Sequence, residues 1–152
     1  MALPAEQTLL KLSGTGIHGV ALYSARGLTQ SLDPIEAASV IRRTINLEAV
    51  DLSLPAARKY NTTINCPNNV NMAPPALDSI WPGMQVTIEC VAELSYKTIG
   101  GTPSRPVVSG SSRVEGDFTR YRPVLTCLIV SMSMGAEEYT AGHEWSMTAT
   151  EV

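Results

Sequence analysis

Short runs in which apolar and polar residues alternate follow one another along most of this chain, and each predicts a β-strand with one buried face. The clearest run covers residues 86–96, and two more cover residues 58–66 and 143–152. Residues 124–134 differ, because this stretch is almost continuously apolar. Such a run is typical of a central strand that is buried on both faces.

A hairpin is predicted around Asn46, from two short stretches over residues 40–45 and 47–52. Just before it, residues 33–36 form the one good helix start. An aspartate there can cap a helix, a proline suits the first helical position, and a glutamate occupies the capping-box position. We expect one short turn of helix at most before the hairpin.

Turn and loop signals separate these elements. The dipeptide Pro82-Gly83 has the chemistry of a type II turn. Residues 1–12 are expected to form an N-terminal arm, anchored as an edge strand by its leucines. Residues 97–117 are rich in Gly, Ser and Pro and predict an extended flexible loop or hairpin. Because strands dominate, we expect one all-β domain over residues 1–152, built as a β-sandwich or β-barrel.

The composition changes this picture in one respect. Only 16% of the 152 residues are charged, against about 25% in typical soluble domains. Such a chain must use Ser, Thr and Asn on its surface or hide part of that surface against neighbours, which favours a subunit of an assembly. The net charge of −3 argues against non-specific nucleic-acid binding. No apolar run is long enough to span a membrane, and residues 1–12 show no signal-peptide pattern.

The residues that carry chemistry are few and scattered. Cys66, Cys90 and Cys127 have no metal-ligand spacing, even with His18 and His143 added. An odd number of cysteines argues against a disulfide framework and favours a reduced, cytoplasmic site of folding. Walker loops, dinucleotide fingerprints and nucleophile elbows are not found in the sequence. We therefore expect no catalytic residue, no metal, no cofactor and no enzymatic activity.

Basic residues offer a binding surface instead. Arg120 and Arg122 alternate with Phe118 and Tyr121, a pattern that could stack on nucleic-acid bases. The negative net charge favours ion pairs between subunits over that alternative. The predicted protein-interface residues are Arg26, Arg113, Arg120 and Arg122.

Several short segments, distributed over most of the chain, resemble segments of one class of proteins in the same order. They are residues 23–30, 42–46, 58–60, 64–66, 80–83, 86–94, 121–125 and 145–152. Together they resemble small, non-enzymatic proteins encoded among the virion genes of tailed bacteriophages. In such proteins the asparagine near position 46 is often followed by glycine, which gives a tight hairpin turn. Here Leu47 follows, so the chain departs from the pattern at this site.

The resemblance implies a virion part, made in the cytoplasm of the bacterial host. We favour a capsid decoration (cement) protein that forms a homo-oligomer and binds the major capsid protein. A neck or tail ring subunit, bound to neck or tail proteins, is the alternative. We expect no membrane and no specific nucleic acid as partners. A further alternative is a glycan-binding β-sandwich of a receptor-binding device, with aromatic platforms at Trp81, Tyr96, Tyr121 and Trp145.

Overall fold

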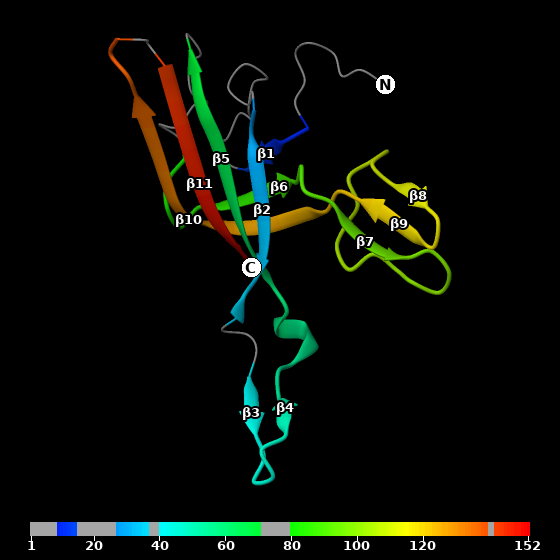
Figure 1. The fold of residues 1–152 in the computed structure, drawn as a ribbon. Coiled ribbons are helices and arrows are strands. Elements are labelled where there is room, and N and C mark those ends of the chain that lie inside the picture. The colour runs from blue at the N-terminus through cyan, green and yellow to red at the C-terminus, as the bar shows by residue number, and fades with distance from the viewer. Residues whose placement is uncertain (1–8, 15–26, 37–39, 71–79, 140–141) are drawn as a thin grey trace.

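The computed structural model describes residues 9–14, 27–36, 40–70, 80–139 and 142–152, and this part of the chain is almost entirely β-structure (Figure 1). A 3-10 turn, η3, covers Pro55–Ala57. The strands are β1 Lys11–Ser13, β2 Thr29–Pro34, β3 Ile41–Arg43, β4 Ala49–Asp51, β5 Tyr60–Val70, β6 Gln85–Glu89, β7 Leu94–Lys97, β8 Arg113–Glu115, β9 Phe118–Tyr121, β10 Val124–Ala136 and β11 Gly142–Glu151. The predicted all-β class is confirmed.

Six of these strands form one antiparallel sheet in the order β1-β6-β10-β11-β5-β2. Strands β1 and β2 are its two edges and do not pair with each other, so the sheet is open rather than a closed barrel. The arm predicted for residues 1–12 ends in the edge strand β1, with Leu10 and Leu12 buried. Residues 1–8 of that arm lie outside the described residues.

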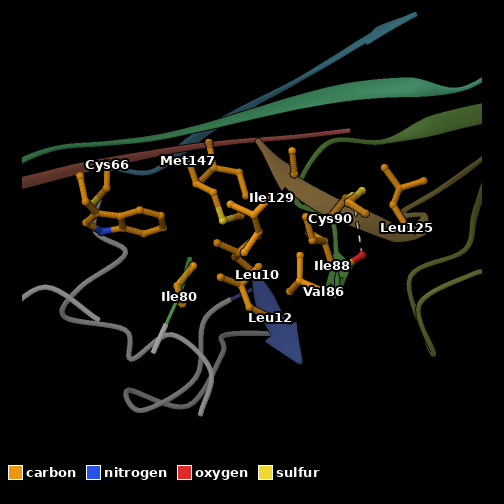
Figure 2. Close-up of a cluster of buried hydrophobic side chains, with 14 residues drawn as sticks. Leu10, Leu12, Cys66, Ile80, Val86, Ile88, Cys90, Leu125, Ile129 and Met147 are labelled. Carbon is orange, nitrogen blue, oxygen red and sulfur yellow. Dashed lines mark hydrogen bonds between the residues drawn. The ribbon is translucent and has the colours of Figure 1, made fainter. Parts of the chain in front are cut away.

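The hydrophobic core lies on one face of this sheet. The sheet curls so that β1 and β6 lie opposite β5 and β11, and Figure 2 shows Ile129 and Met147 pointing toward Leu10 and Leu12. This packing gives the fold a sandwich-like character. The buried cluster consists of Leu10, Leu12, Ile64, Cys66, Ile80, Val86, Ile88, Cys90, Leu125, Cys127, Ile129, Trp145, Met147 and Ala149.

Strand β10 is the central strand predicted over residues 124–134, but the expectation that both of its faces are buried is wrong. Leu125, Cys127 and Ile129 are buried, whereas Leu128 is 38% exposed on the opposite face. The neighbours β6 and β11 pair with the backbone of β10 and leave its outer side chains in contact with solvent in the described part of the chain. A nearly unbroken apolar run therefore occurs here on a strand with one buried face.

Val130 is an inserted residue in β10. The register of the β10–β11 pair shifts between Ile129 and Ser131, so one residue of β10 has no partner on β11. Before this bulge the odd-numbered positions face the core, and after it Met132 packs against the core. Successive side chains of a strand point to opposite faces, so odd- and even-numbered residues normally stay on their own faces along its whole length. The inserted residue brings the even-numbered residues of β10 to the core face after the bulge.

The single strand predicted over residues 86–96 is broken into β6 and β7, which belong to different sheets. At the break, Gln30 Oε1 accepts the N–H groups of Val91 at 2.7 Å and Ala92 at 3.3 Å. Gln30 Nε2 donates to Thr62 Oγ1 at 2.9 Å. The side chain of Gln30 thus accepts the hydrogen bonds that a neighbouring strand would otherwise accept at the bend between β6 and β7. Backbone N–H groups that are not solvated need such an acceptor.

The helix start predicted at residues 33–36 is wrong for Asp33 and Pro34, whereas Glu36 has 3-10 conformation and residues 37–39 lie outside the described residues. Asp33 and Pro34 are the last residues of β2, paired with Asn61 and Tyr60 of β5. Strand β2 is a sheet edge, where a proline that lacks an N–H is tolerated. Pairing with β5 has overridden the local capping signals.

The smaller elements include one confirmed turn. Gly83 has a φ of 91°, and the Met84 N–H donates to the Trp81 carbonyl at 3.2 Å, as in a type II turn. Within the segment predicted as a flexible loop or hairpin, residues 97–117, strand β8 pairs with β9, which pairs with β7 in a three-stranded sheet. The flexibility of that segment stays a prediction.

Candidate functional site: a projecting apolar hairpin

Strands β3 and β4 form a two-stranded hairpin that projects from the six-stranded sheet (Figure 1). The hairpin prolongs the β2–β5 pair, and the Ile35 N–H donates to the Lys59 carbonyl at 2.9 Å where the two pairs join. The Leu52 N–H donates to the Val40 carbonyl at 2.8 Å and closes the base of the hairpin. The hairpin predicted around Asn46 is therefore confirmed, and it stands away from the core.

Apolar side chains cover this hairpin although all residues from 40 to 50 are exposed. Ile45 at its tip is 98% exposed, and the neighbouring Leu47 is 72% exposed. The exposed large apolar residues of this region, here called the apolar hairpin, are Val40, Ile41, Ile45, Leu47, Val50, Leu52 and Leu54. An isolated two-stranded hairpin is at best marginally stable in water, so this composition indicates a surface that gains stability from a partner.

The tip of the hairpin is a three-residue loop in which Leu47 has a positive φ of 65°. The Leu47 N–H donates to the Thr44 carbonyl, and the Thr44 N–H donates to the Glu48 carbonyl, both at 2.9 Å. This is the pattern of a turn followed by a left-handed residue, a position where glycine is favoured. Arg43 Nη1 donates to the Leu47 carbonyl at 2.9 Å and holds the loop closed.

The hairpin is attached to a firm base. Arg105 bonds through Nε and Nη2 to both carboxylate oxygens of Glu151, at 2.5 and 3.0 Å, and Nη2 also donates to the Arg58 carbonyl at 2.8 Å. Its guanidinium lies 5.3 Å from the centre of the Tyr60 ring. The hydrogen bond to Glu151 is the main reason that the pKa of Arg105 is raised above its usual value. These contacts tie the start of β5 to the end of β11 beside the hairpin.

A hollow of about 370 Å³ lies at this base, and its lining includes three basic residues, Arg58, Lys59 and Arg105, beside one acidic residue, Asp51. Asp51 is at its rim and accepts hydrogen bonds from the Ser53 hydroxyl at 2.5 Å and the Ser53 N–H at 2.9 Å. These bonds hold the pKa of Asp51 below its usual value. The base therefore has a positive side, next to the apolar hairpin.

The four arginines predicted as interface residues do not form one site. Arg26 lies outside the described residues. Arg113 pairs with Glu93 at 2.9 Å and with Glu115 at 3.1 Å, and Arg120 also pairs with Glu115, at 2.7 Å. Arg122 Nη1 donates to the Leu9 carbonyl at 3.1 Å and so holds the chain just before β1. The three described arginines thus have partners within the chain, and their role at an interface stays a prediction.

The cysteines and His143, considered above as candidates for metal binding or catalysis, lie where they contribute to the packing of the fold. All three cysteines are buried and none forms a disulfide bond within the described residues, and burial raises the pKa of Cys90 to about 11 and that of Cys127 to about 12. Protonated thiols are poor nucleophiles and poor metal ligands. In the described ranges, no group of three His, Cys, Asp or Glu side chains could hold a metal ion. The Nδ1 atom of His143 is buried and has no hydrogen-bond partner among those residues.

The four aromatic residues considered as a sugar platform are not brought together on the surface. Tyr121 and Trp145 are buried, and Tyr121 packs edge-on against Tyr96 with ring centroids 5.7 Å apart. Trp81 is exposed beside the type II turn. A sugar could not stack on Tyr121 or Trp145 in this arrangement.

Two functional features were missed by the sequence analysis: the exposure of the apolar hairpin and the role of Arg105. The first had no decisive signal, because the adjacent apolar pairs Val40-Ile41 and Ala49-Val50 place apolar residues on both faces of the hairpin, a pattern that is equally typical of a buried strand. Arg105 had no signal, since its partner Glu151 is 46 residues away in the sequence.

In the portion of the chain that the structure describes, no helix is long and apolar enough to cross a membrane. Comparisons with family models, with curated proteins and with solved structures found no match to this chain.

Proposed function

We propose that this chain is a structural, non-enzymatic subunit of a tailed-phage virion, which binds other virion proteins through the apolar hairpin. The observation that carries the proposal is the exposure of Ile45 and Leu47 on a hairpin without a core of its own. The resemblance in sequence to virion proteins supplies the biological setting. Capsid decoration is the position that we favour within the virion.

The energetics of the hairpin support a docking role. Burial of one exposed Ile or Leu side chain contributes about 2 kcal/mol. Three such residues, Ile41, Ile45 and Leu47, would together offset much of the entropy lost when a hairpin is fixed on a partner. The firm base at Arg105 and Glu151 means that little further order has to be imposed on the rest of the molecule.

A neck or tail ring subunit is the second candidate, and the shape of the molecule favours it. Strands β3 and β4 lie at one end of the molecule, and the end of β10 and the start of β11 lie at the other (Figure 1). A subunit with two different ends suits a ring or a stack in which neighbours follow one another in one direction.

The test is to add purified protein to particles that lack it and to measure occupancy. A variant with Ile45→Asn and Leu47→Asn keeps side chains that tolerate the turn, and we expect at least a tenfold loss of binding. The matched control is Ile99→Asn, because Ile99 is 85% exposed on a turn outside the hairpin. Wild-type occupancy of the hairpin variant, with both variants folded, would contradict the proposal.

A further inference from the structure

Charge is divided unevenly between the two ends of this molecule. Residues 123–152 contain no Lys or Arg and four glutamates, of which Glu151 is paired with Arg105. The other three, Glu137, Glu138 and Glu144, lie where β10 gives way to β11, and we call this region the acidic end. Residues 40–60, at the opposite end, contain four basic and two acidic residues. Figure 1 shows these ends far apart, so they cannot meet within one molecule.

The acidic end contains a hollow that suits a guanidinium group. The hollow measures about 540 Å³, and four neighbouring strands contribute polar groups to it: Thr29, Asn65, Ser133, Glu144 and Ser146. These side chains offer acceptor oxygens, whereas arginine carries five donors in a planar fork. The site is therefore complementary to an arginine in both charge and hydrogen bonding.

Gly135 shapes this hollow. It pairs with Glu144 across the β10–β11 ladder, and a Cβ on Gly135 would lie 2.8 Å from Glu144 Oε1. The missing side chain lets the Glu144 carboxylate lie against the strand, where it also lines a second, adjoining hollow of about 220 Å³. Within the described ranges neither Glu138 nor Glu144 forms an ion pair, so both carboxylates are available to a partner.

Apolar groups accompany the charges at both ends. Met134 is 57% exposed and Tyr139 is 95% exposed at the acidic end. Ile45 and Leu47 are exposed at the hairpin tip, close in sequence to Arg42 and Arg43. Each end thus combines two exposed apolar side chains with a net charge, which is positive at the hairpin end, where basic residues outnumber Glu48 and Asp51, and negative at the acidic end.

We infer that the hairpin of one copy docks on the acidic end of a second copy of this chain. The tip packs on the apolar side chains of the acidic end, and Arg42 and Arg43, on opposite faces of the hairpin, lie on the two sides of the docked tip near Glu138 and Glu144. The partner is a second copy because the two complementary surfaces belong to the same chain. The contact joins unlike surfaces, so successive copies form a closed ring or an open filament rather than a two-fold dimer. This inference rests on the proposed function only in taking the hairpin as the docking element.

Two charge-reversal variants test the inference by sedimentation velocity over a range of protein concentrations. We expect the wild type to assemble with rising concentration and to dissociate at high salt, because screening weakens exposed ion pairs. The variant Arg42→Glu/Arg43→Glu makes both ends acidic, and Glu138→Arg/Glu144→Arg makes both ends basic. Each variant alone should stay monomeric, with at least a tenfold weaker association constant.

Mixing the two variants in equal amounts should restore assembly, because each hairpin then meets an end of opposite charge. The matched control is Lys97→Glu, which reverses one exposed charge on the three-stranded sheet and should assemble like the wild type. A wild type that stays monomeric at all concentrations, or a mixture that does not assemble, would overturn the inference. Thermal unfolding of each variant checks that it is folded.

The particle-binding test of the proposed function separates the two claims. If the hairpin variant loses occupancy while the charge-swapped mixture fails to assemble, the hairpin binds another virion protein, and only the self-association is wrong. If occupancy is unchanged while the mixture assembles, the hairpin serves self-association alone, and the proposed function is wrong.

Discussion

Arg105 and Glu151 form the best-buried ion pair of the described residues, with side chains that are only 17% and 8% exposed. The pair joins the loop before β8 to the last residue of β11, and Glu151 Oε2 also accepts the Tyr60 N–H at 3.0 Å. One carboxylate therefore joins the loop between β7 and β8, the start of β5 beside the hairpin, and the end of β11.

Removal of one partner of this pair should be costly. We expect Arg105→Ala to lower the free energy of unfolding by about 3 kcal/mol, because it leaves the Glu151 carboxylate buried without its cation. Urea denaturation measures the loss. Arg113→Ala, which removes the exposed ion pairs with Glu93 and Glu115, is the control and should cost about 1 kcal/mol at most. Equal losses for the two variants would contradict the structural role assigned to Arg105.

The hairpin loop contains a residue that glycine should improve. Leu47 has a φ of 65°, a conformation that costs a side-chain-bearing residue about 1 kcal/mol. We expect Leu47→Gly to slow hydrogen exchange of the hairpin amides, whereas Ile45→Gly should speed it. The same Leu47→Gly change should weaken docking, since it removes an exposed apolar side chain. Faster exchange in Leu47→Gly would show that the loop is not formed as described.

Gln30 should stabilise the bend of the chain between β6 and β7. Gln30→Ala leaves the N–H groups of Val91 and Ala92 without their acceptor, and we expect a loss of about 2 kcal/mol in the free energy of unfolding. Gln30→Glu keeps an acceptor for both groups and should lose less. Equal losses in chemical denaturation would argue against the hydrogen bonds and in favour of packing alone.

The two faces of β10 should respond differently to a charge. Leu128→Asp places a carboxylate on the outer, solvent-exposed face and should leave a folded protein, with a loss of about 1 kcal/mol. Ile129→Asp places it in the core and should abolish cooperative unfolding. Circular dichroism during heating distinguishes the two results. A folded Ile129→Asp variant would mean that the core is not where the structure places it.

Alkaline pH should destabilise the fold through the cysteines. The usual pKa of the thiol is 9.0, and burial raises it to about 11 for Cys90 and about 12 for Cys127. Above pH 9 the unfolded chain therefore releases protons that the folded chain retains, so the free energy of unfolding falls as pH rises. The slope approaches about 1.4 kcal/mol per pH unit for each thiol. Cys90→Ala/Cys127→Ala should flatten this dependence, and an unchanged slope would contradict the assignment.

Local patterns were sufficient for the elements whose neighbours in space are also neighbours in sequence. The hairpin around Asn46 and the type II turn at Pro82-Gly83 are of this kind. The errors arose where a distant segment decides the conformation. Pro34 lies in a strand because β5 pairs with it, and the run over residues 86–96 breaks where Gln30, from β2, takes the place of a ladder partner.

In the candidate site, too, contacts between residues close in sequence could be predicted and contacts with distant segments could not. The hairpin could be predicted, because its strands pair with each other, but its projection from the core could not, because alternation does not reveal whether a second layer covers a strand. Arg105 pairs with Glu151 because the fold brings the loop before β8 against the end of β11. The spacing of residues in the sequence does not indicate this contact.

Val130, which has no partner on β11, marks a bend in β10, the longest strand. A bulge bends its strand and increases the local twist, so the two halves of β10 can serve surfaces that point in different directions. The first half stays with β6 and the core, whereas the second half runs with β11 alone toward the acidic end. Deleting Val130 would leave Ser131 opposite Thr148 and Gly135 opposite Glu144, because the β11 partners on either side of the bulge are already consecutive. The ladder would become regular, and β10 would lose the bend that separates the directions of its two halves.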